Sequence, residues 1–379
     1  MSNRLEDISF PLGFLSKLGE DNLDAKQHTF HVEARQMFHH QKEATVQCGP
    51  SGDVWRFTSD EGSHLHGTDL APFPLGYFNA GMHGDIVQLI LKVAKEQSIE
   101  ISAIDLSIIN HYWLTGSFVL GTGHGHSEPP DIDISIKSSA SQEQINQLIE
   151  KALKSSAVMS FLNLALKNTF AIYVNGRRRN VIDLNDSPAQ DIQDPFLKNQ
   201  SAPVPIDNYH IKDAIYKLPT QVEGQSKPAS ASPQGKVLRN IHGQSKWRAG
   251  ESVIEVDTYL ELPGASHFAF KVAVQASERQ YPQGFALICA GITFCFMTQL
   301  ARYIENMKMP ITGIRVVQDS SYQIENKDAI SSELDTHLYI NGTADDATCT
   351  TLLSVSERTC YLHATAIKVL EPNVKLHIL

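Results

Sequence analysis

Apolar residues occupy most positions of two long segments, about residues 76–97 and 284–307. A helix that is apolar around most of its circumference is usually buried, so each segment predicts a long helix at the centre of a packed unit. Ahead of each helix, apolar and polar residues alternate with a period of two, as in Val54 to Ser59 and Val253 to Leu260, which predicts half-buried strands. The order of elements, strands before a long helix and then strands, a second helix and a final strand, predicts an α+β fold.

This pattern occurs twice along the chain. The segment from Phe78 to Asp85 matches the segment from Ile288 to Cys295 at an offset of 210 residues (295 − 85), with an Ala-Gly pair in common. Further on, the strand around Ile136 matches the strand around Ile340 at an offset of 204 (340 − 136), and the change falls in a Gly-rich stretch of the first copy, residues 114–130. Self-similarity at a fixed period predicts two copies of one structural unit.

Local signals mark the ends of elements in both copies. Ser139 with Gln142, and Thr343 with Asp346, have the spacing of a capping box, so each pair predicts the start of the second helix. Ser63 and Ser266 are expected to begin the strand that precedes each long helix.

Changes in amino-acid composition along the chain divide it into segments. Residues 185–235 are rich in Pro, Ser, Gln and Asp, a composition that buries little surface, so they predict a linker, with a short helix near His210 to Tyr216. The expected organisation is an N-terminal extension (1–43), a first unit (44–184), this linker (185–235) and a second unit (236–379).

Charge and hydropathy exclude some classes of partner. The formal net charge is −10, which leaves no basic surplus to neutralise phosphates, so no nucleic-acid partner is expected. Arg177, Arg178 and Arg179 follow Asn175-Gly176, a type I′ turn signal, and are interpreted as the flank of a hairpin. The most apolar window, Phe285 to Met297, is shorter than the roughly 20 residues that cross a bilayer, so no membrane span is expected.

Five cysteines (Cys48, Cys289, Cys295, Cys349 and Cys360) show no CxxC and no zinc-ligand spacing. Their odd number in a large acidic chain predicts a reducing compartment, the cytoplasm. His124 and His126 lie in the Gly-rich stretch and are interpreted as part of a flexible polar loop, because two ligands do not complete a metal site. Neither a metal nor a cofactor is expected.

The order of elements, with Cys295 inside the second long helix and Cys360 near the end of the second capped helix, resembles the osmotically inducible protein C (OsmC) and organic hydroperoxide resistance family. Members of that family are intertwined homodimers with reactive sites where the subunits meet. The resemblance therefore implies two tandem OsmC-like domains, each a strongly curved antiparallel sheet packed on a long buried helix. Together they would form an intramolecular pseudo-dimer, with further homo-oligomers left open.

The resemblance also implies a chemistry. Cys295 would attack the O–O bond of an organic hydroperoxide, and Cys360 would resolve the resulting sulfenic acid to a disulfide, which a dithiol reductant would reopen. Where the family pattern has an acidic residue, ten residues before the attacking cysteine, this chain has Phe285. Arg248, Arg279 and Arg302 are candidate cations for the thiolate.

The first unit has Asp85 where the second has Cys295, and Ser156 where the second has Cys360 (360 − 204). Thiol chemistry is thus expected only in the second unit. An Asp in an apolar helix is costly unless paired, so Asp85 is expected to be at least partly buried and hydrogen-bonded, with a ligand or catalytic role as the alternative. The rival to a peroxidase is a non-catalytic protein that binds a small hydrophobic ligand between the two units. A third alternative is a metal-binding protein that uses the histidines of the first unit and Asp85.

Overall fold

The computed structural model describes residues 3–16, 28–49, 51–118, 120–190, 192–201, 203–206, 214–221, 223, 236–275 and 279–379. These residues form two β-sheets and six α-helices, so the fold is α+β, as the sequence predicts. Three short 3-10 helices are also present, η1 (Leu5–Asp7), η2 (Ser63–Leu65) and η3 (Lys198–Gln200).

The first sheet joins strands from both ends of the chain. Its spatial order is β1 (Gly13–Ser16), β4 (Val54–Ser59), β3 (Lys42–Cys48), β2 (His28–Gln36), β14 (Ile311–Glu325), β16 (Leu334–Gly342), β7 (Asn168–Val174) and β8 (Arg177–Arg179). In addition β15 (Asp328–Ser331) pairs with β14, and β9 (Asn185–Asp186) pairs with β7. Neighbouring strands are antiparallel except that β7 runs parallel to β16 and to β9.

The second sheet has the order β10 (Ile215–Lys217), β13 (His267–Ala273), β12 (Val253–Leu260), β11 (Val237–Arg248), β5 (Ile101–Thr115), β6 (His124–Ser138) and β17 (Asn373–Ile378). Only the β6–β17 pair is parallel. β11 is paired with β5 from Val237 opposite Leu114 to Arg248 opposite Ala103, so this sheet too is built from distant parts of the chain.

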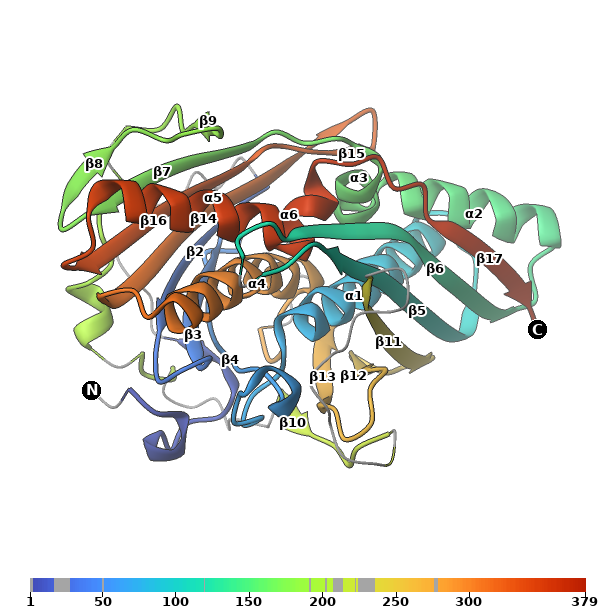
Figure 1. Cartoon of the computed structure of the whole chain (residues 1–379). Coiled ribbons are helices and arrows are strands. Elements are labelled where there is room, and N and C mark those ends of the chain that lie inside the picture. Colours follow the sequence, from blue (N-terminus) through green and yellow to red (C-terminus); the bar gives the residue numbers. More distant parts are fainter. Residues whose placement is uncertain are drawn as a thin grey trace.

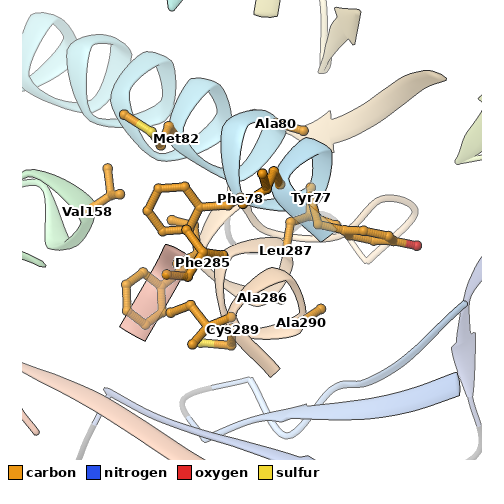
Figure 2. Close-up of a cluster of buried hydrophobic side chains, with 14 of the residues drawn as sticks. Tyr77, Phe78, Ala80, Met82, Val158, Phe285, Ala286, Leu287, Cys289 and Ala290 are labelled. Atoms are coloured by element: carbon orange, nitrogen blue, oxygen red, sulfur yellow. The ribbon is translucent and has the colours of Figure 1, made fainter. Parts of the chain in front are cut away.

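Two long helices lie between the sheets: α1 (Pro74–Glu96) packs on the second sheet and α4 (Gly284–Met307) on the first (Figure 1). They also pack against each other, and side chains of α1 such as Tyr77 and Phe78 lie beside Leu287 and Phe285 of α4 (Figure 2). Because both helices are buried on most faces, they form the centre of one continuous core.

Glycines let these helices approach closely. A Cβ on Gly81 would lie 2.6 Å from the carbonyl oxygen of Gly284, and a Cβ on Gly284 would lie 2.5 Å from the amide nitrogen of Asp85. A Cβ on Gly291 would lie 2.8 Å from the amide nitrogen of Phe78. The Ala-Gly pairs that mark the repeat therefore lie where the backbones of α1 and α4 meet.

Four shorter helices cover the outer part of the core: α2 (Gln142–Lys154), α3 (Ala157–Asn163), α5 (Asp346–Thr359) and α6 (Tyr361–Ala366). Helices α2 and α3 pack on α1, whereas α5 and α6 pack on α4. Each pair therefore sits beside the long helix that precedes it in the sequence.

The ranges 44–184 and 236–379, which the sequence led us to expect as two units, are each divided between both sheets. Strands β2 to β4 join β14 and β16, whereas β11 to β13 join β5 and β6. The expected boundary between residues 43 and 44 lies inside β3, and β2 precedes it. This arrangement results from pairing between strands that are far apart in the sequence. The hydrophobic periodicity of the sequence does not reveal which strands pair.

Several local predictions are confirmed. The strands predicted over Val54–Ser59 and Val253–Leu260 are β4 and β12, and the second long helix has its predicted bounds. Asn175 and Gly176 have positive φ angles of 49° and 78° and connect β7 to β8, as expected of a type I′ hairpin.

Other local predictions are wrong. Ser63 begins the 3-10 helix η2 rather than a strand, because the residues before α1 turn tightly instead of running on along the sheet. The second helices begin two residues later than predicted: Ser141 caps α2 in a capping box with Gln144, and Asp345 caps α5. The β strands before them extend to Ser138 and Gly342.

His124 and His126 are also misassigned, since both lie in β6 and the connecting loop is shorter than predicted. The ring of His126 stacks on Trp113 with centroids 3.8 Å apart. Of the short helix predicted near His210 to Tyr216, residues 207–213 lie outside the described residues, and Ile215–Lys217 form β10.

Within the part of the chain that the structure describes, one helix, α4, is long and apolar enough to cross a membrane by length and composition. Its apolar window is entirely buried in the protein, as in the core helix of a globular fold, so it is weak evidence for a membrane span.

Candidate functional site

The two predicted cysteines lie side by side. Cys295 is in the fourth turn of α4, and Cys360 ends α5 and precedes α6, which packs on α4. The two side chains interact, since Cys295 is one of the neighbours that raise the pKa of Cys360, and both residues are buried. The remaining cysteines, Cys48, Cys289 and Cys349, are buried in the core (Figure 2 shows Cys289 beside Phe285).

A pocket of about 410 Å³ opens beside Cys295; we call it the thiol pocket. Its apolar wall comes from α1, β5, β11 and the loops next to them and includes Phe73, Leu75, Leu114, Phe118 and Ile241. Helix α4, which carries Cys295, also lines the pocket. The pocket is therefore formed by elements from both halves of the sequence.

Two arginines line the thiol pocket. Arg302 follows Cys295 by two turns on α4, donates to Gln299 Oε1 at 3.0 Å and holds its guanidinium 4.2 Å from the centroid of the Phe118 ring. Arg239 reaches in from β11 and is 7% exposed. Both are cations next to a buried thiol, the environment that favours a thiolate.

An acidic residue is also present. Glu61, in the loop after β4, accepts a hydrogen bond from Thr298 Oγ1 at 2.6 Å and lies 3.7 Å from Lys42 Nζ. Lys42 is fully buried and donates to the Thr298 hydroxyl at 2.8 Å and to the His40 carbonyl at 2.7 Å. Glu61, Thr298 and Lys42 thus link the loop and β3 to the helix that carries Cys295.

Burial dominates the protonation of this cluster. It raises the pKa of Glu61 and lowers the pKa of Lys42 and Arg302, while nearby anions, Cys295 among them, act to raise the pKa of both cations. Lys42 and Arg302 thus both interact electrostatically with Cys295.

The second thiol differs. Burial, and then the neighbouring Cys295, raise the pKa of Cys360 well above its ordinary range, and the backbone N–H groups of Leu362 and His363 only partly oppose this. Cys360 is therefore a neutral thiol at neutral pH. Two residues that line the thiol pocket are neutral as well, because burial lowers the pKa of His40 and of His64 to about 3.

The other candidate residues lie elsewhere. Arg248 forms an ion pair with Asp105, and Arg279 forms one with Asp53, so of the three candidate arginines only Arg302 lines the thiol pocket. Phe285 does not line the thiol pocket and contacts Phe30 and Tyr322. No group of three or more His, Cys, Asp or Glu side chains that could hold a metal ion occurs among the described residues.

Sequence reasoning missed Glu61 and Arg239. Both come from elements that are far from Cys295 in the sequence and reach it only through the pairing of β4 and β11 with other strands. Glu61 follows a strand in a polar stretch, and Arg239 occupies an ordinary position of an alternating strand. No local signal distinguishes either residue from a surface charge.

Asp85 is buried and hydrogen-bonded, which confirms that prediction. Its Oδ2 accepts a hydrogen bond from the Ser156 hydroxyl and another from the Val158 amide at 3.3 Å. Ser156 in turn caps α3, accepting from the Met159 amide at 3.1 Å. Asp85 and Ser156 therefore meet as Cys295 and Cys360 do, one on the long helix and one at the start of the following short helix.

Burial raises the pKa of Asp85 from 3.8 to about 6. Below about pH 4 the carboxyl is protonated in both the folded and the unfolded chain. Between about pH 4 and 6 only the folded chain keeps the proton, so stability falls as the pH rises, and the full cost of the buried charge is present above about pH 6. The difference corresponds to about 3 kcal/mol.

We expect Asp85→Asn to be more stable than the wild type by up to about 3 kcal/mol at pH 8, because the amide avoids the buried charge and can still accept from Ser156. At pH 4 the two proteins should unfold at nearly the same denaturant concentration. Urea titrations at both pH values measure this, and Asp328→Asn, at an exposed position, is the matched control. If the wild type and Asp85→Asn differed in free energy of unfolding by the same amount at both pH values, the explanation would be contradicted.

No protein-family model and no curated protein matches the chain. Among solved structures, the chain is similar to an OsmC-like hydroperoxide resistance protein from Jannaschia sp. CCS1, with 18% sequence identity and a TM-score of 0.20. The match covers 32% of this chain and 81% of that one. The likeness is therefore partial.

Proposed function

We propose that this protein is a thiol-dependent peroxidase that reduces organic hydroperoxides through Cys295 and Cys360. The observation that carries the proposal is the proximity of the two thiols, with Cys295 at the wall of a pocket that is also lined by Arg239 and Arg302. A thiol near cations is the reactive kind, whereas a thiol buried in apolar surroundings alone is inert.

The reaction would run in three steps. The Cys295 thiolate attacks the terminal oxygen of the hydroperoxide, the O–O bond breaks, and the leaving alkoxide takes a proton, which gives an alcohol and a sulfenic acid on Cys295. The neutral Cys360 thiol condenses with the sulfenic acid, which forms a disulfide and releases water. An external dithiol then reduces the disulfide by exchange and is itself oxidised to a disulfide.

The lining of the thiol pocket suits an organic rather than an inorganic peroxide. Aromatic and aliphatic side chains, Phe73, Leu75 and Phe118 among them, offer an apolar surface to the organic group. Negative charge that develops on the leaving oxygen would lie near Arg239 and Arg302, where low solvent exposure strengthens the attraction.

We also propose that the chain arose by tandem duplication and forms an intramolecular pseudo-dimer. In support, α1 and α4 begin 210 residues apart (284 − 74), as do β5 and β14 (311 − 101), and α2 and α5 begin 204 residues apart (346 − 142). The strand exchange between the two sheets also supports an origin from two intertwined copies.

The test is the consumption of cumene hydroperoxide by the wild-type protein with a dithiol reductant, together with mass spectrometry of the oxidised protein. We expect turnover and a Cys295–Cys360 disulfide. Absence of both would contradict the proposal and favour a protein that binds a small apolar ligand without transforming it.

We expect Cys360→Ser to react once with hydroperoxide and then stop, because the sulfenic acid on Cys295 has no neighbouring thiol to condense with. Trapping with a sulfenic-acid reagent such as dimedone should label Cys295 in this variant and not in the wild type. Cys349→Ser, which changes a buried thiol on α5 away from the pocket, should turn over like the wild type. Full turnover by Cys360→Ser would mean that Cys360 is not the resolving residue.

A further inference from the structure

A second pocket, of about 670 Å³, lies beside Asp85. We call it the Asp85 pocket. It is bounded by α1, by the start of α4, and by β2, β14 and the α2–α3 junction. None of the residues that line it belongs to the thiol pocket.

The two pockets match position by position. Asp85, Gln88, Leu89, Lys92 and Glu96 line the Asp85 pocket, and the residues 210 positions later, Cys295, Thr298, Gln299, Arg302 and Asn306, line the thiol pocket. Strand pairing extends the match. Tyr112 and Tyr322 are also 210 positions apart (322 − 112), and Tyr112 lies opposite Arg239 in one sheet as Tyr322 lies opposite His28 in the other. The Asp85 pocket therefore has the architecture of the thiol pocket with different chemistry.

Its inner end offers a hydrogen-bond acceptor. Both hydrogen bonds to Asp85 use Oδ2, and Oδ1 has no protein partner among the described residues. An ionised carboxylate accepts hydrogen bonds through both oxygens, so Oδ1 is available to a donor group of a ligand.

Its wall is apolar and aromatic. Phe285 lies with its ring centroid 4.8 Å from that of Phe30 and 5.1 Å from that of Tyr322, and the His28 ring stacks on Tyr322 at 4.4 Å. Burial, and then Lys92, lower the pKa of His28, so its ring is neutral at neutral pH and belongs to this wall.

Its outer end is cationic. Lys92 and Lys327 line the pocket, are exposed, and form no ion pair with a carboxylate of the described residues. Lys151, by contrast, is paired with Glu96 at 3.2 Å. Lys92 follows Asp85 by seven residues, about 10 Å along the helix axis, so the acceptor and the cation stand at opposite ends of the apolar wall.

We propose that the Asp85 pocket binds an amphipathic organic acid of medium chain length, without transforming it. The carboxylate of the ligand pairs with Lys92 and Lys327, its apolar chain lies against Phe30, Phe285 and Tyr322, and a hydroxyl at its far end donates to Asp85. Neither Asp85 nor Ser156 bears a thiol, so the pocket lacks the nucleophile of its counterpart. This inference does not depend on peroxidase activity.

The test uses two probes, ω-hydroxydecanoate and decanoate, and isothermal titration calorimetry on the full chain at pH 8. Wild-type protein should bind the hydroxy acid about tenfold more tightly, because a hydrogen bond to a carboxylate is worth about that factor. Asp85→Ala should bind both acids equally. Lys92→Met should weaken both by several-fold, and since Lys92 is exposed this variant keeps the test independent of folding.

Arg302→Met is the matched control, because it makes the corresponding change in the thiol pocket and should leave the affinity for both acids unchanged. Three results would overturn the proposal: no binding of either acid, affinity that is lost in Arg302→Met and kept in Lys92→Met, or a preference for the hydroxy acid that persists in Asp85→Ala.

Discussion

Cys295→Ser should reduce hydroperoxide turnover by at least about a thousandfold, because removal of an attacking nucleophile leaves only binding and electrostatic effects. A serine hydroxyl at this position is not ionised near Lys42 and Arg302 and is a poor nucleophile towards an O–O bond. The measurement is the rate of cumene hydroperoxide loss with excess dithiol, corrected for the rate without protein.

Cys289→Ser is the matched control for this loss, since Cys289 is on the same helix and equally buried but does not line the thiol pocket. Burial raises the pKa of Cys289 far above its ordinary range, so it is an inert thiol. We expect this variant to keep wild-type turnover. Equal losses in the two variants would point to damage to the core rather than to loss of a nucleophile.

Gly81→Ala should destabilise the protein by about 3 kcal/mol, because the added methyl group meets backbone atoms of the partner helix. The Cβ would lie 2.6 Å from the Gly284 oxygen and 2.8 Å from the Ile288 nitrogen, and neither atom can move unless α1 and α4 separate. The gain in helix propensity, about 1 kcal/mol, offsets only part of this cost. The shift of the urea unfolding midpoint measures the effect.

Gly76→Ala, on the same helix, is the comparison. Its Cβ would meet side-chain atoms only, Phe73 Cζ and Thr258 Oγ1, each at 3.0 Å, and side chains can shift by a few tenths of an ångström. We expect a change within about 1 kcal/mol, because strain and improved helix propensity nearly cancel. If both substitutions had the same effect, the close approach of the two helices would not explain the glycine at position 81.

Much of the local structure was accessible from the sequence, since it depends on periodicity. The two apolar segments are the central helices, and the alternating segments are strands, because solvent exclusion acts on residues close together in the chain. Errors arose where short-range signals compete. Ser139 and Ser141 are both able to cap a helix, and the length of the preceding strand, which depends on its pairing, decides between them.

The candidate site could be predicted only in part. Cys295 and Cys360 stood out because each lies in an element with a recognisable pattern, and Asp85 stood out because a charge interrupts an apolar helix. Glu61 and Arg239 could not be found, since their proximity to Cys295 is a property of how the strands pair. The same limit applies to Lys92 and Phe285, which share a pocket although they lie in different halves of the sequence.

The exchange of strands between the two sheets also bears on how the chain folds during synthesis. The edge of β2 finds its partner only when β14, about residues 311–325, has been made, and β6 pairs with the last strand, β17. Bringing together strands that are so far apart in the sequence is slow, because the entropy of closing a long loop is lost before any contact forms. Until then the unpaired strand edges can pair with wrong partners. The N-terminal half must therefore remain unfinished until the C-terminal half arrives: β5 can gain β11 first, whereas β2 and β6 wait for β14 and β17.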